Sequence, residues 1–499
     1  MKDDFNRRWS WREHIQLNAF WFGLNLSSGI GTPVLLPYMI AMFVPSESKN
    51  SALATIRVAS LAVAMLAQPV AGILSDRNRS RWGRRRPFIL IGTLLNLFFL
   101  AIVGISPLFM DQGSSTANPA WGFNLSYLVL MAGVILLQAS TNMAQGAYQA
   151  LIPDRVPPDQ RGRSSGVKAV LELLPAIVII FIGPLVDAGY IWWTLAIIGA
   201  VMVSTMLVVV TTTHEVPYTQ KVHTPIKGRV IRAIALVALF VGITQASAVV
   251  IRWAGDRLSS DGIGLGLRVI GLGGMGLLGM AGSIVVGVYF GTRMAIGRAA
   301  SRRRVSFIWW VVNRLLFLAA IGSVQGFAQY YLADVIGVER PAAMTTLMLA
   351  FVVVFLLPAA LGGGILADRY SHKKLLTYAG LAAAAGTSIL LFANSMTVVI
   401  VGACIIGAGT GLFFSTNWAL GTSLAPAKEA GRYLGISNLA GAGAGIVGTG
   451  LGGPMADFFN RLQPGLGYHV IFVLYLILFL LSVAALARIQ EPKRRSSPD

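Results

Sequence analysis

Apolar stretches, each about as long as a membrane-spanning helix, recur along the whole chain. A helix rises 1.5 Å per residue, so about 20 apolar residues cross a hydrocarbon layer roughly 30 Å thick. Strands of a membrane barrel are shorter and alternate strictly, unlike these runs. The pattern predicts an all-α polytopic membrane protein with fourteen spans. They are expected at 15–42, 53–74, 88–106, 123–152, 165–186, 190–212, 230–251, 263–291, 305–333, 343–366, 375–393, 397–424, 433–456 and 468–487.

Composition supports a membrane protein and argues against a soluble enzyme. Of the 499 residues, 55% are hydrophobic and only 12% are charged, whereas soluble domains carry about 25% charged residues. A single cysteine, Cys404, excludes a disulfide within the chain and a cysteine-based zinc site. The five histidines lie far apart, and no phosphate-binding loop or catalytic set is present. We therefore expect no metal, no cofactor and no enzymatic activity.

The basic residues lie mostly on one side of the predicted spans. With the N-terminus inside, 31 of the 40 lysines and arginines fall in inner segments and 6 in outer segments. This bias predicts a protein of the plasma (inner) membrane with both termini in the cytoplasm. It also favours contact with anionic lipid at the cytoplasmic face. The net charge of +20 is thus interpreted as a topology signal, and no nucleic-acid partner is expected.

The chain contains an internal repeat. Three motifs recur in the same order and at matching positions in the predicted topology. The pairs are Gly72-Ile-Leu-Ser-Asp76-Arg77 with Gly364-Ile-Leu-Ala-Asp368-Arg369, Gly162-Arg163-Ser-Ser-Gly166 with Gly431-Arg432-Tyr-Leu-Gly435, and Gly183-Pro184-Leu-Val-Asp187 with Gly453-Pro454-Met-Ala-Asp457. Parallel half-repeats are a transporter architecture, with the substrate site between the halves at the membrane midplane.

The repeat divides the chain into two six-helix halves, 1–212 and 305–499. Between them, 213–304 is predicted to form a cytoplasmic linker with an extra pair of spans. One of these contains Gly271-Leu-Gly273-Gly-Met-Gly276, which matches a dinucleotide fingerprint but follows no strand. We interpret its glycines as permitting close helix packing. The pair is expected to be peripheral and structural, or else an oligomer contact.

Several motifs resemble one family. The segment Asp76-Arg-Asn-Arg-Ser-Arg-Trp-Gly83-Arg84-Arg85-Arg86-Pro87-Phe88-Ile89 resembles the signature of the loop between spans 2 and 3 in the major facilitator superfamily. Its triple arginine is similar to that of sucrose transporters and of glycoside–pentoside–hexuronide cation symporters. Gln145-Gly-Ala-Tyr-Gln-Ala-Leu-Ile-Pro-Asp154 and Thr32-Pro-Val-Leu-Leu-Pro37-Tyr38 resemble the same group. The resemblance implies two pseudo-symmetric halves that move around a central site lined by spans 1, 4, 7 and 10. The group usually has twelve spans, so the two extra helices are a departure.

Polar residues form stripes at helical spacing on those four spans. Amides both donate and accept hydrogen bonds, which suits a hydroxyl-rich ligand, and aromatic rings such as Trp21, Trp418 and Tyr330 could stack on a sugar. The alternative is hydrogen bonding between packed helices. The candidate substrate-binding residues are Trp21, Asn25, Gln138, Asn142, Gln145, Gln325, Gln329 and Asn417.

Two ionisable residues lie deep in predicted spans, where such groups are functional candidates. Glu172 lies about two turns into span 165–186, and a desolvated carboxyl there could bind and release a proton. Arg314 lies in span 305–333. The alternatives are a local pair of Glu172 with Lys168, one turn earlier, and snorkelling of Arg314 to the inner surface.

Charged residues at the inner ends of the spans are candidates for gating. A carboxylate at Asp76 could pair with Arg77 or Arg84 and could face a helix N-terminus, which would give a contact that breaks on opening. The alternative is a basic loop that only sets topology. The full set of gating candidates is Asp76, Arg77, Gly83, Arg84, Arg85, Asp154, Arg161, Asp368, Arg369 and Arg432.

The sequence thus predicts a secondary transporter of a small polar solute. By resemblance, the cargo is a sugar or glycoside carried with protons. One rival is a proton-coupled exporter of drugs or metabolites in the same fold, although Asp187 stands where that group usually has paired glycines. The other is a non-transporting membrane assembly factor, or a factor that handles lipid or pigment, whose cavity would be apolar.

Overall fold

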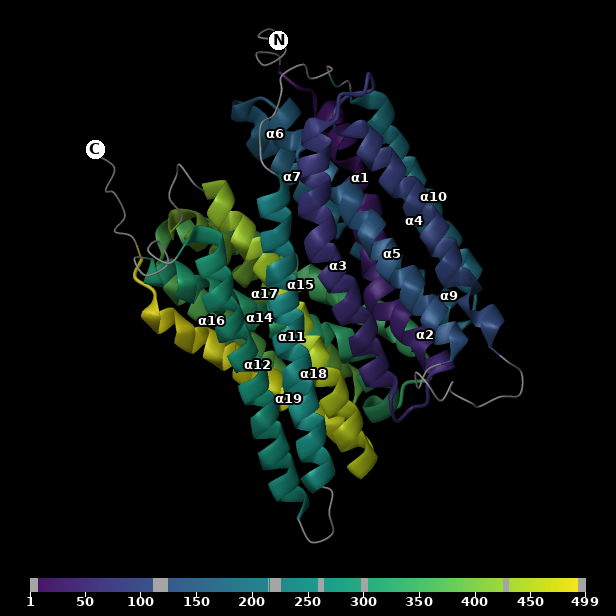
Figure 1. Cartoon of the computed structure of the whole chain (residues 1–499), viewed down its shortest axis with the longest axis vertical. Coiled ribbons are helices and arrows are strands. Elements are labelled where there is room, and N and C mark those ends of the chain that lie inside the picture. The colour runs from purple at the N-terminus through teal and green to yellow at the C-terminus, as the bar shows by residue number, and fades with distance from the viewer. Residues whose placement is uncertain are drawn as a thin grey trace. The chain divides into compact units, whose positions relative to one another are not determined.

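The described residues are mostly helical, as the sequence predicts. The computed structural model describes residues 8–110, 124–213, 215, 226–258, 264–297, 304–424 and 430–491, and these ranges contain helices and no strand (Figure 1). Within them, twelve helices are long and apolar enough to cross a membrane, the first at Trp11–Phe43 and the last at Leu466–Arg488. Twelve of the fourteen predicted spans are therefore confirmed as helices of spanning length and hydropathy.

The two remaining predicted spans are helical but differ from the others. Predicted span 165–186 is a series of short helices, α7 (Arg161–Leu173), α8 (Pro175–Ile179) and α9 (Gly183–Asp187). Pro175 breaks the regular helix after Leu173 because proline has no N–H to donate. Predicted span 433–456 corresponds to α18 (Ala430–Leu462), which carries Pro454 in its interior.

The chain divides into two compact units that do not coincide with the sequence halves. Unit 1 comprises 1–46, 59–234 and 340–347, and unit 2 comprises 47–58, 235–339 and 348–499. Three helices are consequently shared by the units. Helix α3 (Lys49–Arg77) begins in unit 2 and continues in unit 1, whereas α11 (Ile226–Leu258) and α15 (Pro341–Arg369) begin in unit 1 and continue in unit 2. From Ala235 onwards, the extra helix pair of the linker clusters with unit 2.

Unit 1 is organised around α1 (Trp11–Ile30), which packs against α7, α8 and α10 (Ile191–Thr212). Ser10 and Glu13 start α1 with reciprocal side-chain to backbone hydrogen bonds, a capping box. The helix continues through a π-helical turn, η2 (Gly31–Leu35), into α2 (Leu36–Phe43). Beside them, α4 (Arg86–Ile105) packs on α5 (Leu125–Tyr148) and on α10, and α6 (Leu151–Arg155) follows α5.

Unit 2 is organised around α14 (Val305–Tyr331), which packs against α18 and α19 (Leu466–Ala485). Helix α16 (His372–Leu391) lies against α17 (Met396–Leu424) and α19. A π-helical turn, η5 (Leu332–Ile336), extends α14 and ends at Gly337, whose φ of 73° is accessible to glycine without strain.

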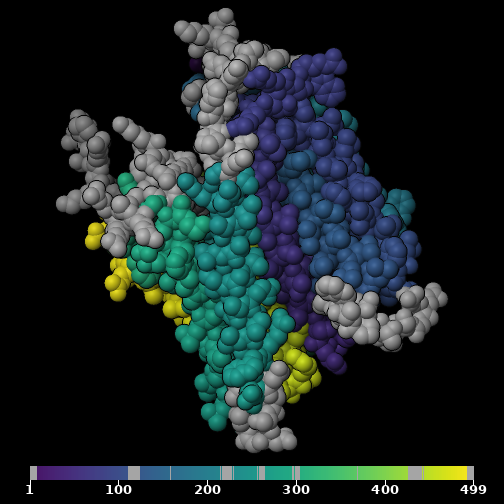
Figure 2. Space-filling view, in the orientation of Figure 1, coloured from purple at the N-terminus to yellow at the C-terminus, as the bar shows by residue number. Residues whose placement is uncertain are grey.

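The extra helices α11 (Ile226–Leu258) and α12 (Leu265–Ile296) form a long hairpin (Figure 1). Helix α12 packs against α18, α14 and α19. Both helices lie at the surface in Figure 2 and carry exposed apolar side chains. These include Val249, Trp253, Ile270 and Leu278. Such a surface suits contact with lipid.

Candidate functional site

The first cluster in unit 1 surrounds Trp21 of α1. The ring of Trp21 lies 5.1 Å from the ring of Tyr148 on α5, and the Lys168 ammonium lies 4.2 Å from its centroid. Lys168 also pairs with Glu172 one turn further along α7, at 3.3 Å. Trp21 is only 4% exposed, so its ring is covered in this structure. A sugar could stack on this ring only after a neighbouring group moved.

Glu172 therefore forms the ion pair with Lys168 that the sequence analysis gives as an alternative to a coupling role. The sequence analysis does not predict the contact of Tyr148 with Trp21 or the cation–π contact of Lys168 with the same ring. Tyr148 donates a hydrogen bond to the carbonyl of Leu17 at 2.8 Å, which fixes its ring beside Trp21. Lys168 and Glu172 are each 31% exposed at the side chain, so water can reach both.

The amide stripe of α5 is partly occupied by local hydrogen bonds. Asn142 donates to the carbonyl of Gln138 at 2.8 Å, and Asn25 on α1 donates to the carbonyl of Trp21 at 2.9 Å. Gln149 accepts a hydrogen bond from Gln68 of α3 at 3.3 Å. Asn25, Gln138 and Gln145 are half-buried, whereas Asn142 is 7% exposed. The side-chain oxygens of Asn25 and Asn142 are not used in these bonds, so each amide keeps acceptor capacity.

A second cluster in unit 2 surrounds Arg314 of α14. Its guanidinium donates to the Asn417 side-chain oxygen on α17 at 2.9 Å, and the Asn417 amide donates to Asn313 at 3.1 Å. Asn313 then donates to the carbonyl of Ser482 on α19 at 2.8 Å. The Arg314 guanidinium carbon also lies 5.7 Å from the Trp418 ring.

This chain of amides holds a positive charge without a carboxylate, because within the described part of the molecule Arg314 makes no ion pair. Its Nε is buried and has no hydrogen-bond partner. The cluster joins two predicted residues, Arg314 and Asn417, which the sequence placed in separate stripes.

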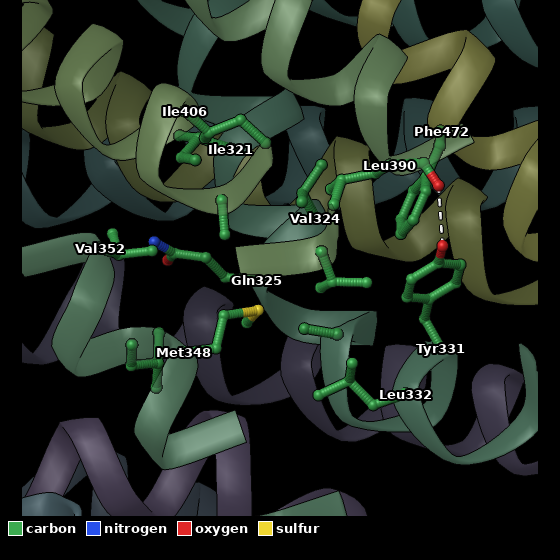
Figure 3. A pocket seen from close by; sticks show the side chains of 14 residues that line it. Ile321, Val324, Gln325, Tyr331, Leu332, Met348, Val352, Leu390, Ile406 and Phe472 are labelled. Carbon is green, nitrogen blue, oxygen red and sulfur yellow. Dashed lines mark hydrogen bonds between the residues drawn. The ribbon is translucent and has the colours of Figure 1, made fainter. Parts of the chain in front are cut away.

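The two glutamines of α14 lie elsewhere on the helix. Gln325 is 11 residues beyond Arg314, which is about 16 Å along the axis. Its amide extends into a small pocket inside unit 2, towards Val352 (Figure 3). Apart from Gln325 and the hydroxyl of Tyr331, which donates to the Leu390 carbonyl at 2.7 Å, the pocket is lined by apolar side chains. Gln329 is 3% exposed. The structure therefore does not bring these glutamines to the Arg314 cluster.

The predicted gating residues of the first repeat form a compact ionic cluster in unit 1, between the end of α3 and the start of α4. Asp154 binds Arg84 at 2.6 Å and Arg85 at 3.1 Å, and Arg85 also binds Asp76 at 2.5 Å. Arg85 further donates to the Ser75 hydroxyl at 2.5 Å. Burial lowers the pKa of Arg84, but the hydrogen bond and charge of Asp154 outweigh it and raise that pKa overall. The partner of Asp76 is thus Arg85, whereas the sequence suggested Arg77 or Arg84.

Glu215, which the sequence analysis missed, completes this cluster. Its carboxylate accepts hydrogen bonds from the backbone N–H groups of Arg85 at 2.7 Å and Arg86 at 3.2 Å, at the N-terminus of α4. Negative charge is favourable there because it complements the helix dipole. Gly83 has a φ of 100°, and a Cβ at this position would collide with Glu215. No local signal links a residue after α10 to a loop 130 positions earlier.

The remaining gating candidates are only partly described. Arg161 at the start of α7 donates to the carbonyls of Pro153 at 2.8 Å and Val156 at 3.2 Å. Arg77 and Arg369 are the last residues of α3 and α15. The side chains of Asp368 and Arg432 lie outside the described residues.

One deep charge is not among the candidates that the sequence analysis names. Arg57 falls in predicted span 53–74, and α3, which begins at Lys49, places it inside the helix. Its guanidinium donates to the Gly322 carbonyl of α14 at 3.3 Å and leaves room for no side chain at Gly326.

Among the residues that the structure describes, no group of three histidine, cysteine, aspartate or glutamate side chains could hold a metal ion.

Comparison with known proteins gives matches over most of the chain. Residues 30–258 match the family described as MFS/sugar transport protein, and residues 310–499 match the Major Facilitator Superfamily. The chain is 31% identical over 170 residues to the general alpha-glucoside permease of Schizosaccharomyces pombe, covering 32% of this chain and 29% of that one. It is 30% identical over 174 residues to the human proton-associated sugar transporter A, covering 34% and 22%. These alignments span less than a third of either relative.

Solved structures share the fold over nearly the full chain. A D-xylose-proton symporter aligns with a TM-score of 0.63 and 16% identity, covering 97% of this chain and 99% of that one. A peptide transporter aligns with a TM-score of 0.66 and 17% identity, covering 97% of both chains. At these identities the likeness establishes the fold alone.

The chain therefore shares the fold of these membrane proteins over nearly its full length. With the two family matches and the loop motifs around Asp76, the chain belongs to the major facilitator superfamily. This confirms the resemblance inferred from the sequence.

Proposed function

We propose that this protein is a secondary active transporter that carries a sugar or glycoside together with protons by alternating access. The observation that carries the proposal is the match of residues 30–258 to the family described as MFS/sugar transport protein. The named relatives, an alpha-glucoside permease and a proton-associated sugar transporter, point to the same class of cargo.

The polar side chains of α1, α5, α14 and α17 are proposed to bind the solute. Asn25 and Asn142 are held by their amide nitrogens while their oxygens remain available, which supports recognition of hydroxyl groups. Arg314 and Asn417 supply a second polar group in unit 2. The proposed set is Trp21, Asn25, Gln138, Asn142, Gln145, Gln325, Gln329 and Asn417.

Glu172 is the proposed proton-coupling residue. When it is ionised, the pair with Lys168 holds the ammonium close to the Trp21 ring. Protonation of Glu172 removes the charge that holds Lys168 there and so loosens the cover on Trp21. Proton binding and solute binding would then favour each other at one place on α1 and α7. Arg314 is a second candidate, because a guanidinium without a carboxylate responds to any anionic group that approaches it.

We further propose fourteen membrane spans, with α7–α9 and α18 crossing the membrane in addition to the twelve helices of spanning length. The charge bias supports a plasma-membrane location with both termini in the cytoplasm, and anionic lipid at the inner face. The two six-helix halves 1–212 and 305–499, with the linker 213–304 between them, remain the proposed domain organisation.

The test is counterflow in proteoliposomes, in which unlabelled solute inside drives entry of labelled solute. The purified protein should exchange at least one member of a panel of labelled α-glucosides and disaccharides, whereas liposomes without protein should not. If no sugar exchanges but a lipophilic cation is moved against a pH gradient, the exporter class replaces this proposal.

A further inference from the structure

Helix α7 carries a polar face that extends from the proposed coupling residue, Glu172, towards the start of the helix. Ser164, Lys168 and Glu172 follow one another at intervals of four residues, so they share one side of the helix. Helix α1 packs against α7, and Lys168 lies over the ring of Trp21 on α1. Both helices belong to unit 1, so the contact between them lies within a single unit.

Ser164 is hydrogen-bonded to α1 in the interior of unit 1. The Asn18 amide donates to the Ser164 hydroxyl oxygen at 2.9 Å and to the carbonyl of His14, one turn earlier on α1, also at 2.9 Å. Asn18 and Ser164 are both fully buried. Because Asn18 supplies the donor of their bond, the Ser164 hydroxyl keeps its own hydrogen to donate elsewhere along the contact. A hydroxyl that accepts on one side and donates on the other can pass a proton along.

His14 is an ionisable residue near the start of the same contact. It is 1% exposed, and neither ring nitrogen has a hydrogen-bond partner within the described part of the molecule. The rings of Trp9 and Trp11 lie 5.6 Å and 6.4 Å from the imidazole ring. A neutral imidazole has one donor and one acceptor nitrogen, and leaving both unpaired in the interior is costly. Such an arrangement is unusual in a native structure and indicates a role for the ring.

An imidazole is suited to proton exchange with the cytoplasm, because its ordinary titration falls between about pH 5 and 8. The charged groups that act on His14 are Glu13 on its own helix and Arg163 on α7. Helices α8 and α10, which also pack against α1, carry no ionisable side chain. Among the described residues, no carboxylate of another helix binds the ring and holds it permanently charged.

The predicted topology gives the contact a direction. It places His14 in the inner segment 1–14 and Glu172 about two turns inside the membrane. Glu172 is eight residues beyond Ser164, which is about 12 Å along α7. His14 is four residues before Asn18, which is about 6 Å along α1. The polar groups therefore extend over about 18 Å, from the proposed coupling residue to the predicted cytoplasmic end of α1.

From this arrangement we infer that His14 receives the protons that leave Glu172 along the α1–α7 contact and releases them to the cytoplasm. The Glu172 carboxyl gives up its proton and pairs again, as a carboxylate, with the Lys168 ammonium. Lys168 and the Ser164 hydroxyl each give one proton forward as they take one up, so neither changes its charge. The imidazole becomes an imidazolium and returns to the neutral form when it gives the proton to water.

The inference rests on the proposed proton coupling at Glu172 and adds a residue that the sequence analysis does not place among its candidates. His14 lies just outside the first predicted span, 15–42, and so is not among the deep ionisable groups. The first test below needs no sugar. A failure of His14 to bind protons and a failure of sugar transport are therefore distinguishable.

The first test asks whether His14 binds a proton at all. The ring signals of the five histidines are followed by NMR in lipid nanodiscs between about pH 5 and 8, and His14→Gln identifies the signal of His14. We expect that signal to titrate reversibly within this range. A His14 ring that stays neutral throughout would be a purely structural side chain and would overturn the inference.

The second test measures proton-driven uptake and counterflow on the same proteoliposomes. His14→Gln and Ser164→Ala should each lower uphill uptake roughly tenfold or more, because a positioned acid–base group is lost. Counterflow needs no net release of protons and should persist, which also shows that the variants fold. The matched controls are Ser165→Ala, at an exposed neighbouring position, and His469→Gln in unit 2, and neither should change either rate.

Chemical rescue separates a proton acceptor from a structural role. In His14→Ala, imidazole supplied on the cytoplasmic side should restore uphill uptake, because it can take up the proton that His14 no longer accepts. The same imidazole should not restore uptake in Glu172→Gln, which lacks the proton donor. Undiminished uphill uptake in both His14→Gln and Ser164→Ala, or a loss in His14→Ala that imidazole does not restore, would overturn the inference.

Discussion

At the scale of single residues, the account depends on a small number of polar groups with defined partners. Glu172 lies against Lys168, and Lys168 lies against Trp21. Arg314 is held by Asn417. Glu172 and Asn417 each give a prediction for solute transport.

Replacing Glu172 by glutamine removes the proposed proton site while keeping the shape of the side chain. Uphill uptake driven by a pH gradient should fall to the level of liposomes without protein, whereas exchange of labelled for unlabelled sugar should persist. The measurement is uptake and counterflow on the same proteoliposomes. Unchanged uphill uptake would remove Glu172 from the coupling step.

Replacing Asn417 by alanine leaves the Arg314 guanidinium without its acceptor and breaks the chain through Asn313. A hydrogen bond to a charged group is worth about 1.5–3 kcal/mol, so the apparent KM for the transported sugar should rise roughly tenfold or more. Ser482→Ala is the matched control, because Asn313 keeps its bond to the Ser482 carbonyl. Equal KM values for Asn417→Ala and wild type would exclude this cluster from solute binding.

At the scale of elements, the stability of the fold depends on how the helix ends are capped and how closely the helices pack. Glu215 caps the N-terminus of α4 from a distant part of the chain. The α11–α12 hairpin depends on glycines that let the two helices approach.

Glu215→Gln should weaken the cap on α4, because the neutral amide interacts less with the helix dipole than the carboxylate does. Interactions of this kind contribute about 0.3–1 kcal/mol, so the melting temperature in detergent should fall by a few degrees. Glu47→Gln, at an exposed loop position, is the control. A melting temperature equal to that of the control would show that the contact does not stabilise α4.

Gly287→Val tests whether the extra hairpin is a structural element. A Cβ at Gly287 would lie 2.5 Å from the ring of Phe240 on α11, so valine should destabilise the protein by about 1–3 kcal/mol. Gly282→Val on the same helix meets no atom within 4 Å and is the matched control. If the hairpin is peripheral, counterflow per folded molecule should not change. Loss of counterflow in correctly folded Gly287→Val would instead give the hairpin a part in transport.

At the scale of the whole molecule, much of the topology could be predicted because hydrophobic length alone specifies a spanning helix. The first span was placed at 15–42 and is found at Trp11–Phe43. The break between α7 and α8, by contrast, depends on one proline in an apolar run and was not foreseen. The superfamily was also predictable, because the loop around Asp76 carries its signature locally.

The candidate site was harder to predict. The spacing of polar residues along the sequence shows which of them share a face of a helix, but it does not show which other helix packs against that face. The stripe on α5 was visible, but the Tyr148 ring beside Trp21 and the Glu215 cap depend on contacts between residues more than a hundred positions apart. The repeated Gly-Pro-x-x-Asp motif was detected as a repeat, and its contacts with α3 and α15 became visible only in three dimensions.

The most direct test of the central claim is to follow protons while sugar moves. In proteoliposomes with a trapped pH dye and no initial gradient, adding an α-glucoside or disaccharide that the counterflow panel identifies should acidify the interior. Acidification should depend on the inward sugar gradient and should be absent in Glu172→Gln. Sugar entry at the same rate with no change in internal pH would contradict proton symport.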